Sequence, residues 1–67
     1  MILNCGFNRR RIDASGRKLH GYEHVNKTGI EVPDLDFMNF GEKIRAELMK
    51  HKPEGDGWII TGYTRVD

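Results

Sequence analysis

The sequence has few of the features that hold small exported or membrane proteins together. It contains a single cysteine, Cys5, so no disulfide can form within the chain. No apolar run approaches the roughly 20 residues that a membrane helix needs. The opening residues place their charges after the apolar part, which is the reverse of a signal peptide. These absences predict a cytoplasmic protein without a membrane span and exclude a disulfide-rich secreted fold.

The composition is that of a folded rather than a disordered chain. Hydrophobic residues make up 37% of the 67 residues and charged residues 31%. A domain of this length buries only about 60% of the surface of its unfolded chain. We therefore expect one domain, 1–67, that stands alone and has a small core. Homo-oligomerisation is one way for such a core to gain burial.

No pattern in the sequence is typical of catalysis, metal binding or a nucleotide cofactor. Cys5 falls among apolar residues of an expected strand, where a thiol is inert. His20 and His24 lie about 13 Å apart along an expected strand, too far to share one metal ion, and His51 is remote in sequence. The glycines at 55–57 precede a strand, whereas phosphate loops precede a helix. We expect no cofactor, no metal and no enzymatic activity.

The strongest periodic signal predicts a helix over 34–52. Asp34 and Asp36 are candidate caps at its start, and Pro53 forbids its continuation. The apolar residues at helical spacing are Phe37, Phe40, Gly41, Ile44 and Leu48. This stripe is expected to face the core.

Alternating residues predict a hairpin over 2–25 and a strand over 58–66. The turn at 13–16 places Phe7 opposite Glu23 and Cys5 opposite Val25. One hairpin face then carries Leu3, Cys5, Phe7, Leu19, Gly21 and Val25. The other carries Asn4, Asn8, Arg10, Lys18, His20, Tyr22 and His24. In the last strand, Trp58, Ile60, Thr64 and Val66 share one face, and Ile59, Thr61, Tyr63 and Arg65 the other.

These elements predict an α+β fold of the order β-β-α-β. The helix returns the last strand beside the first, which gives a three-stranded antiparallel sheet of order 2-1-3. The helix packs on one face of that sheet.

Charge is distributed unevenly along the chain. Residues 1–32 contain six Lys or Arg against three Asp or Glu, a balance of +3. Residues 33–67 contain five against seven, a balance of −2, and the sum matches the formal charge of +1. The hairpin tip concentrates the cations. The residues expected to contact a partner are Arg9, Arg10, Arg11, Arg17, Lys18, His20 and Tyr22.

Three interpretations of the basic tip stay open. The leading one is a small inhibitor or adaptor that docks on an acidic patch of a larger protein. Its size is typical of proteins encoded by phages and other mobile elements, which often act on nucleic-acid machinery. The alternative is a nucleic-acid-binding module that uses the tip and the outer hairpin face. The third is a solvated tip whose charges protect a strand edge.

Overall fold

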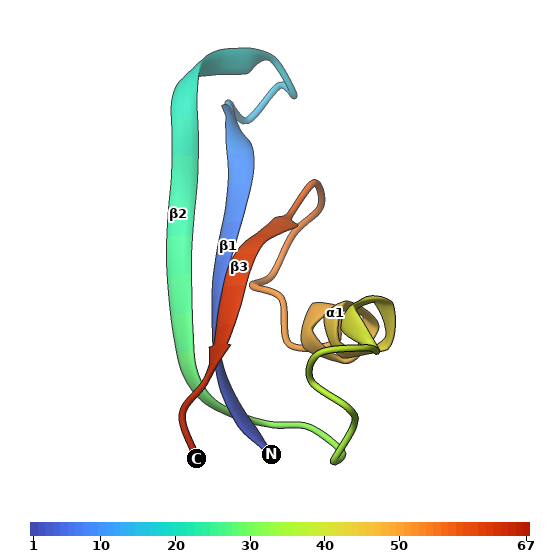
Figure 1. Ribbon diagram of the computed structural model, residues 1–67. Helices are drawn as coiled ribbons and strands as arrows, with labels where there is room; N and C mark the ends of the chain where they lie inside the picture. The colour runs from blue at the N-terminus through green and yellow to red at the C-terminus, as the bar shows by residue number, and fades with distance from the viewer.

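The computed structural model describes residues 1–67 and confirms the α+β fold. Two strands, β1 (Ile2–Ile12) and β2 (Lys18–Glu31), precede helix α1 (Gly41–Met49) and strand β3 (Ile59–Arg65). The sheet has the order β2-β1-β3, and β1 runs antiparallel to both neighbours (Figure 1). The helix is neither long enough nor apolar enough to cross a membrane.

The central strand β1 supplies the floor of the core. Leu3, Cys5 and Phe7 are almost fully buried, because α1 covers the side of β1 that its odd-numbered residues face. Ile44 and Leu48 of α1 are completely buried against this cluster. The eight core residues are Leu3, Cys5, Phe7, Ile30, Val32, Ile44, Leu48 and Trp58. The even-numbered residues of β1 therefore face away from the helix.

The hairpin register expected from the tip turn is wrong by two residues. Phe7 lies opposite Val25 and not Glu23, while Cys5 lies opposite Lys27. The cause is an irregularity between the Arg10 and Ile12 pairs, where β2 holds two extra residues around Gly21 with φ +87°. Because the shift is an even number, Val25 still faces the helix side.

A second irregularity lengthens the hairpin beyond the expected end at residue 25. One extra residue of β2 lies between the pairs of Leu3 and Cys5, where Gly29 has φ +69° and donates its N–H to Asn4 Oδ1 (3.1 Å). A single extra residue reverses the facing of the strand that follows. Ile30 and Val32 consequently enter the core, although the segment looks like a short link in the sequence.

The helix is shorter than the predicted span 34–52. Asp36 accepts hydrogen bonds from the Met38 N–H (3.1 Å) and the Asn39 amide (2.6 Å), and this turn replaces the first helical turns. A short carboxylate that bonds its own following backbone competes with helix formation in this way. At the other end, the helix stops at Met49, before Pro53.

The apolar stripe of the helix is confirmed only in part. Gly41, Ile44 and Leu48 lie in the helix, and the latter two are buried. Phe37 lies before the helix and packs edge-to-face on Tyr63 with a centroid distance of 5.6 Å. Phe40 precedes the first helical residue and remains exposed. Leu19, expected on the apolar hairpin face, is exposed as well.

The expected faces of β3 are also wrong, because a bulge interrupts the strand. Gly62 lies opposite Gly6, yet Ile60 lies opposite Phe7, so Thr61 is an extra residue. Ile60 and Tyr63 therefore both pack against the core, although strict alternation would separate them. Ile59 faces solvent.

We predict that Ile44→Asp abolishes the folded state, because it buries an unpaired carboxylate in the core. Ala46→Asp is the matched control, since Ala46 is exposed two residues further along the same helix and gains the same charge. Circular dichroism during heating should show no cooperative transition for the first variant and a transition close to that of the parent protein for the second. Similar melts for the parent and Ile44→Asp would contradict the assigned core.

Candidate functional site on the hairpin arm and the open sheet face

The distal part of the hairpin extends past the core as a two-stranded arm, residues 9–23. Strand β3 pairs with β1 only from Leu3 to Asn8, whereas β2 stays paired to β1 as far as Ile12. The molecule is accordingly elongated, with extents of 41 × 18 × 16 Å. Figure 1 shows β2 bending over at the far end of the arm, above the start of β3.

Six of the seven expected contact residues gather at the end of the arm and are exposed. They are Arg10, Arg11, Arg17, Lys18, His20 and Tyr22. Arg10 lies opposite Tyr22 in the ladder, its guanidinium 5.9 Å from the ring centroid. Arg10 Nε also donates to the Leu19 carbonyl oxygen (2.9 Å), which holds the side chain in place. Tyr22 keeps 56% of its surface exposed.

Apolar side chains accompany these cations. Ile12, Leu19 and Tyr22 are three of the seven large hydrophobic residues that the protein exposes, and all three lie on the arm. Ile12 lies opposite Lys18, so an apolar and a cationic side chain are neighbours on one face. A hairpin tip that only has to remain in water does not require exposed large apolar side chains, so this mixed surface favours a contact with a partner.

The carboxylate of Asp13, the acidic residue of the tip turn, accepts hydrogen bonds from other residues of the same turn. Asp13 Oδ1 accepts hydrogen bonds from the Ser15 hydroxyl (2.7 Å) and from the N–H groups of Ser15 and Arg17 (both 2.9 Å). The Ser15 hydroxyl, followed by the Arg17 N–H, lowers the pKa of Asp13 below its ordinary value. Asp13 therefore acts as a structural residue of the turn.

Arg9 is the exception among the expected contact residues, because its side chain is used inside the molecule. Its guanidinium lies 4.5 Å from the ring centroid of Trp58, pairs with the Glu23 carboxylate and donates to the Asp56 carbonyl oxygen (3.3 Å). Only 21% of the Arg9 side chain is exposed. The arm is thus clamped at its base to the loop that precedes β3.

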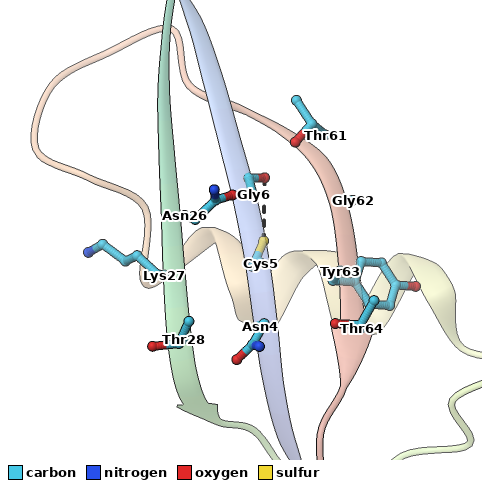
Figure 2. Close-up of a pocket in the computed structure, with 10 residues that line it drawn as sticks. All are labelled: Asn4, Cys5, Gly6, Asn26, Lys27, Thr28, Thr61, Gly62, Tyr63 and Thr64. Atoms are coloured by element: carbon cyan, nitrogen blue, oxygen red, sulfur yellow. Dashed lines mark hydrogen bonds between the residues drawn. The ribbon is translucent and has the colours of Figure 1, made fainter.

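The open face of the sheet carries a second feature, a shallow depression that the sequence analysis missed. Figure 2 views it with the helix behind the strands. Cross-strand pairs build it in rows, with Asn4 opposite Thr64 and Gly6 between Asn26 and Gly62. Its lining residues are Asn4, Cys5, Gly6, Asn26, Lys27, Thr28, Thr61, Gly62, Tyr63 and Thr64. None of them is acidic, and Lys27 is the one cation.

Gly6 lets two polar side chains approach closely at the floor of this depression. A Cβ atom at Gly6 would lie 2.6 Å from Thr61 Oγ1 and 3.2 Å from Asn26 Oδ1, so a side chain there would push the Thr61 hydroxyl aside. A glycine inside a strand often marks such a close approach. Gly6 and Gly62 are the residues in the sequence that could have indicated the depression. That they are neighbours follows only from the register of β1 and β3.

Cys5 lies beneath the sheet, on the helix side, and is not placed for nucleophilic chemistry. It is 2% exposed, and burial raises the pKa of its thiol. No three His, Cys, Asp or Glu side chains come together in a group that could hold a metal ion.

Comparison with known proteins gives no further guide to the site. No protein-family model, curated protein or solved structure matches the chain.

We predict that Arg9→Ala lowers the free energy of unfolding by about 1–2 kcal/mol, because it removes a cation–π contact and a partly buried ion pair. Arg11→Ala is the matched control and should change that energy by less than about 0.5 kcal/mol, since Arg11 is exposed. Urea titration followed by Trp58 fluorescence measures both. Equal stability of the two variants would show that the clamp contributes nothing.

We also predict that the tip turn loosens in acid. A carboxyl group whose pKa is lower in the folded state stabilises that state above the unfolded pKa of about 3.9 and loses this contribution as the pH falls below it. The Asp13→Asn variant keeps a side-chain oxygen that can accept these hydrogen bonds, but this side chain cannot titrate. Its melting temperature should therefore fall less than that of the parent protein between about pH 6 and pH 3. An identical fall would mean that Asp13 does not contribute to acid sensitivity.

Proposed function

We propose that the protein is a non-enzymatic binding protein, an inhibitor or adaptor that docks its hairpin arm on an acidic patch of a larger protein. The observation that carries the proposal is the composition of the arm, which exposes cations and large apolar side chains together. Arginine and tyrosine, together with tryptophan, are enriched among the residues that anchor protein interfaces.

The shape of the arm supports docking. The two-stranded part beyond Asn8 can enter a concave surface because neither the helix nor β3 pairs with it. Clamping by Arg9 limits the freedom of its base, so less conformational entropy is lost when a partner binds.

A protein partner accounts for the apolar residues of the arm better than a phosphate backbone does. Ile12 is 49% exposed and Leu19 39% exposed, and neither has a role in neutralising phosphate. Burying both in an interface removes apolar surface from water, while Arg11 and Arg17 pair with carboxylates at its rim.

The test compares two charge-matched variants. Arg11→Ala with Arg17→Ala removes two exposed cations from the arm, and Lys43→Ala with Arg45→Ala removes two from α1. Tagged forms of the parent protein and both variants are used to capture proteins from lysate with and without nuclease treatment, and the captured protein is then purified for direct titration. We expect the arm variant to weaken binding about tenfold or more and the helix variant to keep it.

The same experiment has two outcomes that reject the proposal. If both variants bind the purified partner equally well, the arm is not the interface. If capture disappears after nuclease treatment, the captured proteins were held through nucleic acid and the arm has no protein partner of its own.

A further inference from the structure

We propose that the open face of the sheet, from the depression at Gly6 and Gly62 to Tyr22, binds single-stranded nucleic acid. This site goes beyond the docking role of the arm, because most of it lies over the core part of the sheet. The face is continuous, since Asn4, Gly6, Asn8 and Arg10 alternate along β1 on the side away from α1.

The cross-strand pairs form rows across this face, and an extended single strand of nucleic acid can follow the spacing and order of these rows. Asn8 lies opposite His24, and Arg10 lies opposite Tyr22, one row further along. Successive rows are about 6.6 Å apart, from the rise of two strand residues. A single strand lying along β1 would pass from the depression over Asn8 to Tyr22 and place one nucleotide near each row.

Each end of this track offers a contact suited to nucleic acid. Tyr22 presents an exposed ring on which a base can stack, and Arg10 beside it can reach a phosphate. At the other end, the glycine floor admits a flat base or a sugar, while Lys27, which lies opposite Cys5, points its amine away from the depression (Figure 2). Because no carboxylate lines the depression, nothing there repels the phosphate backbone.

Two of the three amide side chains on this face, those of Asn8 and Asn26, are not used by the fold, whereas the Asn4 oxygen accepts the Gly29 N–H. Asn8 Oδ1 is buried without any hydrogen-bond partner, an unfavourable state for a carbonyl oxygen. Its side chain therefore loses no hydrogen bond at that oxygen when it turns towards a base edge. Asn26, Thr61 and Thr64 make no side-chain hydrogen bonds within the chain and are free to read bases or to contact sugars.

Gly62 allows the depression to be filled without disturbing the fold. A Cβ atom at Gly62 meets no other atom within 4 Å, and its φ is not in the left-handed region. Gly62→Leu should therefore fold and occupy the space of a bound nucleotide. Ala46→Leu on the exposed side of α1 adds a similar apolar side chain away from the face and is the matched control.

The test is fluorescence anisotropy with a labelled DNA strand of about 15 nucleotides, the matching RNA strand and the DNA duplex. We expect both single strands to bind more tightly than the duplex and to weaken steeply between about 50 and 200 mM salt. Tyr22→Ala and Gly62→Leu should each raise Kd about tenfold, whereas Tyr22→Phe and Ala46→Leu should change it less than about twofold. Circular dichroism confirms that each variant is folded.

Three results would overturn this site. They are no binding of either single strand at about 50 mM salt, equal binding of strand and duplex, and equal Kd values for Gly62→Leu and Ala46→Leu. The result is separable from that for the arm, because Gly62→Leu leaves Arg11 and Arg17 untouched. A folded Gly62→Leu protein should therefore still capture a protein partner.

Discussion

Packing of Ile44 and Leu48 onto the odd-numbered residues of β1 is the contact on which the rest of this structure depends. A helix of nine residues covers only a short length of the sheet and only one of its faces. The parts of the sheet that α1 does not contact are not packed against any other element. The open sheet face and the distal arm are thus consequences of a core too small to hide them, and both functional proposals concern surfaces that the helix leaves exposed.

Two of the three irregularities of the sheet enlarge the core beyond what alternation allows. The extra residue at Gly29 brings Ile30 and Val32 under the helix, and the extra residue at Thr61 brings Tyr63 to the same side as Ile60. Without these bulges the sheet would lose part of its apolar cover on the helix side. Three residues, Ile30, Val32 and Tyr63, therefore reach the core side through local breaks in pairing, whereas the even shift at Gly21 leaves Val25 on that side.

The order of elements could be predicted from the sequence because it depends on local signals. The turn at Asp13, the periodicity around Ile44 and the β-branched run after Trp58 each act over a few residues. Register could not be predicted, because it depends on where extra residues are absorbed, and a glycine in a strand does not reveal whether it marks a bulge or a close approach. The predicted start of the helix is wrong for a related reason, because Asp36 suits a helix cap and a tight turn equally well.

The candidate site also has one part that the sequence predicts and another that it does not. A cluster of cations at the tip is visible in the sequence, but the distinction between Arg9 and its neighbours is not. Arg9 meets Trp58 only because β3 pairs with β1 and delivers the preceding loop to the base of the arm. The depression likewise requires Gly6 and Gly62, which are 56 positions apart, to become partners. Such sites arise from long-range pairing and leave no local pattern.

Both surfaces share β1, and this has a mechanical consequence. The arm end and the depression lie on one uninterrupted strand, whose pairing with β2 runs from Ile2 to Ile12. The Arg9 clamp lies between them and ties that strand to Trp58, so the arm cannot swing independently of the sheet without breaking the clamp. A protein held by the arm and a strand held on the open face would then keep a fixed relative orientation. For a chain with so small a core, rigidity between two sites comes from this one continuous strand.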